Sequence, residues 1–167
     1  MPNSSHVNRN IAFQIIKEFF NGSKQLTEIT SKHLNQNISS MDRKFITSLA
    51  KGVIRFKSAL DLDIEKSLHG NINNLSDTAL NILRIGVYQI RHMDGVPNYA
   101  AVSTSVEISK RIDPNISKLL NAVLRQTIRT DPLNIPGRST FDSTSFKYFS
   151  HPKWLMEKWI KDFGKEE

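Results

Sequence analysis

The side chains of this sequence that could bind a metal ion or transfer a proton are scattered singly. No histidine is followed three or four residues later by a second metal ligand, which is the spacing with which helices build metal sites. The histidines are His6, His33, His69, His92 and His151. We therefore interpret them as solvated or capping side chains and expect no metal site.

Carboxylates, glycines and cysteines give no stronger sign of catalysis. Two carboxylate pairs, Asp61 with Asp63 and Asp162 with Glu166, fall on helical stretches that we expect to be exposed, where solvated charge is the common explanation. The 7 glycines never cluster into a phosphate-binding loop. The absence of cysteine excludes disulfides, thiolate metal ligands and cysteine nucleophiles. The sequence thus predicts no catalytic residue and no cofactor site in this chain.

Basic side chains form two rows that could hold a polyanion. The formal net charge is +7 and the pI about 9.7, so the surface field attracts nucleic acid. Lys44, Lys51 and Arg55 share one face of a predicted helix. Lys118, Arg125 and Arg129 align in the same way on a later helix. Each row could follow an RNA phosphate backbone, and the alternative for each is a set of independent solvated or salt-bridged charges.

Other basic and aromatic residues stand outside these two rows. Arg9 flanks the first helix and is a further candidate for RNA binding, whereas Arg84 and Arg91 belong to a helix that otherwise has the composition of core, so their charges must reach an edge. The aromatic residues in apolar rows, where core packing is predicted, are most of Phe13, Phe19, Phe20, Phe45 and Phe56. Trp154 is the exception, and it could either stack on a base or dock on a protein.

Apolar residues recur at helical spacing up to Arg129, which predicts an all-α domain of about seven helices over residues 1–129. No window is long and apolar enough to span a membrane, and we expect a soluble cytoplasmic protein. The segment 39–68, with Ser39 as its cap, fits either one long helix or two with a bend, and Ser76 or Asp77 caps a helix that we expect to be central. The remaining predicted helices span residues 8–21, 24–34 with Ser23 as its cap, 98–111 and 114–129.

The chain changes character after Arg129. Proline, glycine, serine and threonine dominate residues 130–149, which we interpret as a linker. Helical spacing returns in residues 150–163, within a final segment 150–167. Leu155, Trp159 and Phe163 share one face of this amphipathic helix, and such a face needs a surface to dock on.

Several blocks of residues follow one another along the chain: Asp42–Arg43, Leu49 with Gly52–Arg55, Ile82–Gln89, Val96–Val102 with Val106 and Glu107, and Asn121–Arg125. In this order the blocks resemble the NusB-like helical domain over residues 6–129. Arg43, Arg55, Arg84 and Arg125 fall in these blocks, and a structural role between helices competes with RNA binding for each of them. Free antitermination factors of this fold bind RNA partly through arginines at the start of the first helix, and here only Arg9 remains of that stretch.

The resemblance implies a function as well as a fold. NusB-like domains occur as free antitermination factors and as the N-terminal part of the Sun, or RsmB, methyltransferases that modify cytosine in small-subunit rRNA. His151–Leu155 resembles the segment that opens the methyltransferase part, which favours the second group. That family uses S-adenosylmethionine and a cysteine pair, and neither the fold that binds the cofactor nor a cysteine occurs in this chain.

Three hypotheses follow. The chain could bind rRNA through its basic rows on behalf of a methyltransferase region that follows in a longer protein. It could instead be a docking module that packs, through the face of Leu155, Trp159 and Phe163, on its own methyltransferase domain or on a ribosomal protein. Finally, it could be a free antitermination factor that assembles with a ribosomal protein and RNA.

Overall fold

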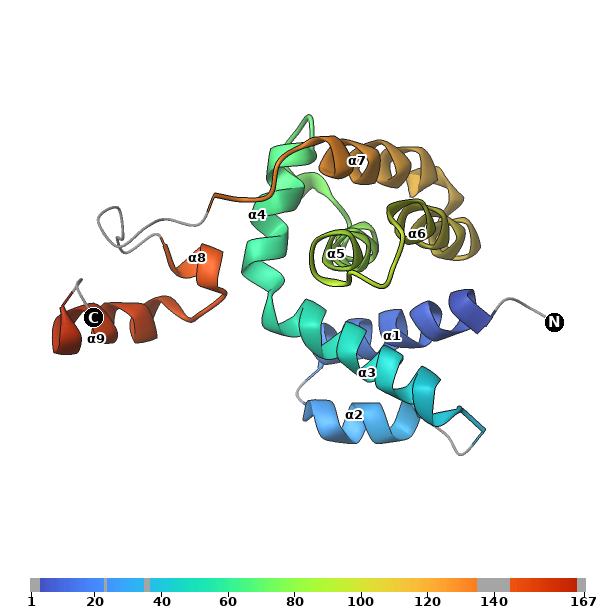
Figure 1. The fold of residues 1–167 in the computed structure, drawn as a ribbon, viewed down its shortest axis with the longest axis horizontal. Coiled ribbons are helices and arrows are strands. Elements are labelled where there is room, and N and C mark those ends of the chain that lie inside the picture. The colour runs from blue at the N-terminus through green and yellow to red at the C-terminus, as the bar shows by residue number, and fades with distance from the viewer. Residues whose placement is uncertain (1–3, 23, 35–36, 135–144, 165–167) are drawn as a thin grey trace.

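The computed structural model of the chain describes residues 4–22, 24–34, 37–134 and 145–164, and within these residues every regular element is helical (Figure 1). This confirms the predicted all-α class. The α-helices are α1 (Ser4–Asn21), α2 (Leu26–His33), α3 (Ser40–Arg55), α4 (Lys57–Ser67), α5 (Asp77–His92), α6 (Asn98–Ile112), α7 (Ser117–Arg129), α8 (Phe146–Phe149) and α9 (Lys153–Phe163). Short 3-10 turns, η1 (Ile72–Asn74) and η2 (Pro114–Ile116), precede α5 and α7.

Side-chain caps begin two of the predicted helices. The Ser39 hydroxyl accepts a hydrogen bond from the Asp42 amide at 3.1 Å, and the Ser76 hydroxyl accepts one from the Ala79 amide at 3.2 Å. Each cap satisfies an amide that the first helical turn leaves without a partner, which is why α3 and α5 begin at these serines. Helix α1 starts at Ser4 rather than at Asn8, and the predicted cap Ser23 lies outside the described residues.

Phe56 divides the long third segment into two helices, so the bent alternative is the correct one. Its backbone, with φ −96° and ψ 16°, departs from α geometry between α3 and α4. The Phe56 ring stacks on His92 at a centroid distance of 5.0 Å and on Tyr88 at 6.2 Å. The bend is therefore anchored to the C-terminal half of α5 through aromatic contacts.

Helix α5 forms the centre of the bundle, as its composition predicted. Residues 81–89 are all buried, and α1, α3, α4, α6 and α7 all contact this helix. Figure 1 shows α5 nearly end-on, with α4 to its left, α6 to its right, α7 above it, and α1 and α3 below it. An α-helix that is apolar on most sides is stable in water only when neighbours cover it all round, so the other helices are arranged by this requirement.

Two glycines allow the neighbouring helices to approach closely. A Cβ atom at Gly52 of α3 would lie 2.0 Å from Cζ of Tyr88, which belongs to α5. A Cβ atom at Gly86 of α5 would lie 2.6 Å from a methyl carbon of Leu124 in α7. Both distances are far inside van der Waals contact, so any larger residue would have to displace the Tyr88 ring or the Leu124 methyl groups, or push the helices apart.

Two arginines of α5 form ion pairs with α4 at the edge of the core. Arg84 donates to both carboxylate oxygens of Asp61, with Nε–Oδ1 2.7 Å and Nη2–Oδ2 2.8 Å. Arg91 donates to both carboxylate oxygens of Asp63, with Nε–Oδ2 2.6 Å and Nη2–Oδ1 3.1 Å. Its Nη2 also donates to the carbonyl oxygen of Thr130 at 3.0 Å. The expectation that Asp61 and Asp63 are solvated is thus wrong, because each carboxylate is paired with an arginine of α5. The two arginines are seven residues apart and therefore lie on the same face of that helix.

The chain after α7 returns along α4. Lys66 donates to the Asp131 carbonyl oxygen at 3.0 Å, and α8 packs on α4, where the Ala59 amide donates to the Ser150 hydroxyl at 3.0 Å. Within the predicted linker, residues 145–149 contain the short helix α8, while residues 135–144 lie outside the described residues. Helix α9 falls within the predicted segment 150–163 and lies at the edge of the molecule, away from α5 (Figure 1).

Replacing Gly52 with alanine should destabilise the fold. The added methyl group meets a Tyr88 ring that is held by Phe56 and His92, and overpacking of this kind costs about 1–3 kcal/mol. Alanine regains about 1 kcal/mol of helix propensity, so we expect a net loss of up to about 2 kcal/mol in the free energy of unfolding. Urea denaturation, monitored by circular dichroism, measures the free energy of unfolding. Gly95→Ala is the control, because nothing lies within 4 Å of its Cβ position, and equal losses in both variants would contradict the packing argument.

Breaking the ion pair between Arg91 and Asp63 should cost more than breaking an exposed pair. Their side chains are only 11% and 5% exposed, so Asp63→Ala leaves a buried charge without its partner, at about 3–5 kcal/mol. The double variant Asp63→Ala/Arg91→Met removes that charge and should recover part of the loss. Glu28→Ala breaks an exposed pair with Lys24 and should change the free energy of unfolding by less than about 1 kcal/mol. A double variant no more stable than Asp63→Ala would show that pairing is not the cause.

Candidate nucleic-acid interface

The basic row of α7 is exposed along its whole length. Leu120, Val123 and Leu124 turn one face of this helix into the core, and the opposite face carries Lys118, Arg125 and Arg129. The Arg125 Nε donates to Asn121 Oδ1 at 3.1 Å, which orients the guanidinium along the helix. None of the three cations takes part in a carboxylate ion pair among the described residues. Their charge therefore remains available to an anionic ligand.

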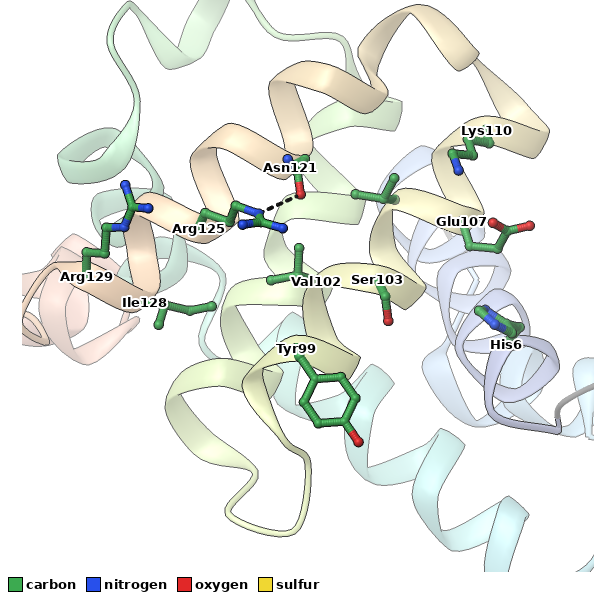
Figure 2. Close-up of a pocket in the computed structure, with 11 residues that line it drawn as sticks. His6, Tyr99, Val102, Ser103, Glu107, Lys110, Asn121, Arg125, Ile128 and Arg129 are labelled. Atoms are coloured by element: carbon green, nitrogen blue, oxygen red, sulfur yellow. Dashed lines mark hydrogen bonds between the residues drawn. The ribbon is translucent and has the colours of Figure 1, made fainter.

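A groove of about 740 Å³ runs between α6 and α7 and brings part of this row together with residues of another helix. Arg125 and Arg129 line it from α7, while Tyr99 and Lys110 line it from α6 (Figure 2). Lys118 is not among the lining residues. Tyr99 and Lys110 were not predicted as site residues, although their spacing places both on one face of α6, because only the pairing of α6 with α7 makes that face one side of a groove.

The groove has an excess of positive charge and some polar groups. Its carboxylate, Glu107, lies 3.6 Å from the Arg111 guanidinium, so that charge is partly balanced by its own helix. Ser103 and Asn121 contribute hydroxyl and amide groups, and His6 of α1 lines one end. Nδ1 of His6 is buried without a hydrogen-bond partner among the described residues. Phosphates and polar base edges are ligands that this lining can satisfy.

The second predicted row, Lys44, Lys51 and Arg55, is also exposed but lies elsewhere. It belongs to α3, which Figure 1 places on the opposite side of α5 from α7. The Arg55 guanidinium lies 5.5 Å from the centroid of the Phe56 ring, a cation–π contact that keeps the side chain near the bend. The two rows therefore do not form one continuous surface, and a single RNA strand would have to pass round the bundle to contact both.

Arg9 is not on the surface. Its side chain is only 5% exposed, its Nε donates to Oε1 of Gln89 in α5, and its guanidinium lies 5.0 Å from the centroid of the Phe45 ring. Burial lowers the pKa of Arg9 from its ordinary value. The predicted RNA contact at Arg9 thus has no geometric basis here, because the start of α1 packs against α3 and α5 rather than standing free.

Two of the other arginines in the resembling blocks have structural contacts. Arg43 donates through Nη1 to the carbonyl oxygen of Leu34 at 3.1 Å, next to the C-terminus of α2. Arg84 is held by Asp61 and also donates to Oδ1 of Asn81 at 2.8 Å. Of the four arginines weighed between a structural role and RNA binding, these two are engaged inside the bundle, while Arg55 and Arg125 are exposed.

The predicted docking face of α9 remains uncovered in this structure. Trp159 is 40% exposed and Phe163 58% exposed, while Leu155 is half-buried. Trp159 makes an edge contact with the His151 ring at a centroid distance of 5.4 Å. The residue of α9 that is buried is Met156, next to this face. Trp154 is exposed as well.

Within the part of the chain that the structure describes, no group of three or more histidine, aspartate or glutamate side chains could hold a metal ion. No helix there is long and apolar enough to cross a membrane.

Comparison with known proteins identifies relatives. The NusB family profile matches residues 6–129. A probable ribosomal RNA small subunit methyltransferase B of Synechocystis is 32% identical over 165 residues, which are 95% of this chain and 36% of that protein. The chain therefore spans about a third of the length of this relative, in its N-terminal portion.

Solved structures share the fold at low sequence identity. A crystal structure of the antitermination factors NusB and NusE in complex with double-stranded RNA matches with a TM-score of 0.68 and 20% identity, covering 77% of this chain and 98% of that one. The crystal structure of PH0851 matches with a TM-score of 0.72 and 17% identity, covering 99% of this chain and 37% of that one. These structures show the NusB-like fold, and the profile match over residues 6–129 shows that the chain belongs to the NusB family.

Proposed function

We propose that this chain is the RNA-binding domain of an S-adenosylmethionine-dependent methyltransferase that modifies cytosine in small-subunit (16S) rRNA. In this proposal the chain holds the rRNA, and the cofactor and the reacting cysteines belong to a region outside these 167 residues. Binding would be mainly electrostatic, with modest sequence preference, because phosphate contacts position RNA without reading its bases.

The observation that carries the proposal is the row of cations on α7 together with the groove beside it. Lys118, Arg125 and Arg129 are exposed and not paired with carboxylates among the described residues, and two of them line a groove that Lys110 enters from α6. Several cations on one surface can replace the counterions of a phosphate backbone, and their release then drives binding.

The relatives support the methyltransferase reading over the free antitermination factor. The Synechocystis relative, named for rRNA methylation, matches almost the whole chain at 32% identity, whereas the NusB–NusE–RNA complex matches at 20%. That complex nevertheless supports RNA as the ligand, because it holds a protein of the same fold together with double-stranded RNA.

A second candidate function, docking, is favoured by the exposed face of α9. Trp159 and Phe163 leave apolar surface in contact with water, which is unfavourable unless a partner covers it. The partner in this reading is the methyltransferase domain of the same protein or a ribosomal protein. The two functions are compatible, because α9 and α7 present different surfaces.

RNA titration at several salt concentrations tests the main proposal. For the wild-type chain, the logarithm of the association constant should fall linearly with the logarithm of salt concentration. The triple variant Lys118→Ala/Arg125→Ala/Arg129→Ala should lower the magnitude of that slope by about two to three, since each phosphate contact contributes about one. Fluorescence anisotropy of a labelled fragment of small-subunit rRNA is a suitable measurement.

The α3 row provides the matched control. Lys44→Ala/Lys51→Ala/Arg55→Ala removes the same number of positive charges from the other side of the bundle, so a general effect of net charge would appear equally in both variants. We expect the α3 variant to retain most of the wild-type slope. If the wild-type chain binds no RNA even at low salt, the proposal is wrong and docking becomes the leading function.

A further inference from the structure

Tyr99 is an aromatic ring whose exposure helix packing does not explain. It belongs to the first turn of α6, 77% of its surface is exposed, and it makes no hydrogen bond or ring contact among the described residues. Apolar surface that remains in contact with water contributes no hydrophobic stabilisation to the fold. The ring therefore has a free π-face at the margin of the groove between α6 and α7.

The surroundings of Tyr99 match the parts of a nucleotide. Val102 lies one turn further along α6, and Ile128 faces it from α7, so the floor beside the ring is apolar. Figure 2 shows Arg125 and Arg129 along the α7 side of the same groove and Ser103 next to Tyr99 on the α6 side. The volume, about 740 Å³, falls within the range of about 300–1,000 Å³ that is typical of sites for small organic groups.

We propose that this groove binds an unpaired nucleotide of RNA, with its base stacked on Tyr99 and the adjacent phosphates held by Arg125 and Arg129. The inference rests on the proposed function and adds to it the class of RNA that the site accepts. In a duplex the bases are stacked on one another, and a side chain reaches a base face only where the strand is splayed open. An exposed ring beside a cationic row thus fits single-stranded RNA or a loop.

A protein ligand fits the same groove less well. The lining carries three cationic side chains, Lys110, Arg125 and Arg129, against the carboxylate of Glu107, which Arg111 partly balances. An apolar helix laid in the groove would have to remove these charges from water without compensation, whereas a phosphate backbone pairs with them. The α3 row has no comparable ring, because Phe56 beside Arg55 is already stacked on His92 and Tyr88.

Three substitutions of Tyr99 test the stacking contact in the complete chain. The probe is a short labelled RNA of mixed sequence, used as a single strand and annealed to its complement. Tyr99→Ala should weaken single-strand binding about five- to hundredfold, as loss of one stacked base does, while leaving the salt slope unchanged because no charge is removed. Tyr99→Phe should bind like the wild type. Tyr99→Leu, which retains apolar volume without a π-face, should resemble Tyr99→Ala.

The outcomes separate this inference from the proposed function. Duplex binding should be weaker than single-strand binding for the wild type and insensitive to all three substitutions. If the wild type binds RNA with a strong salt dependence but Tyr99→Ala binds equally well, the stacking inference is overturned and the proposed function stands. Full affinity in Tyr99→Leu would overturn it too, because apolar contact would then suffice. No RNA binding by the wild type would overturn both. Thermal unfolding of each variant checks that the substitution at this exposed position leaves the fold intact.

Discussion

The burial of α5 is the constraint on which the rest of the structure depends. Residues 81–89 are covered on every side, and a helix of this kind has no face left for solvent or for a ligand. Its neighbours must approach closely, which explains why glycine occurs at Gly52 and Gly86, where the chain passes Tyr88 and Leu124. Because a buried charge is unfavourable without a partner, the arginines of α5 need carboxylates close to them. Asp61 and Asp63 of α4 supply these carboxylates for Arg84 and Arg91.

The same constraint sorts the arginines of the chain into two groups. In the first group, the guanidinium groups donate hydrogen bonds to other groups inside the bundle and cannot also contact RNA. This group faces the central helix or a helix end and includes Arg9, Arg43 and Arg84. Those on the outer faces of the peripheral helices, such as Arg125 and Arg129, have no such partner in α5. A surface that binds RNA must therefore lie on the peripheral helices, and the positive net charge alone does not identify which of these helices carries it.

Helix periodicity predicted the elements well because it depends on local chemistry. The caps at Ser39 and Ser76 and the exposed face of α7 follow from residues close together in the chain. The contacts that could not be predicted join distant residues. Arg9 has the sequence context of a surface arginine, yet its partner Gln89 lies 80 residues away, and Asp61 is 23 residues from Arg84. Tyr99 does not stand out in the sequence, because only the position of α7 beside α6 shows that its ring is left at a groove.

Electrostatics cannot choose between the two basic rows, because each carries three cations on the exposed face of one helix. Shape makes the distinction. The α7 row borders a groove whose floor is apolar beside an unused ring, whereas the ring beside the α3 row holds the bend between α3 and α4 in place. A site that combines phosphate contacts with a stacking platform can distinguish a single strand from a duplex, which charge by itself does poorly. A domain that holds rRNA for modification of one base would need that distinction, since the base must be unpaired before an enzyme can reach it.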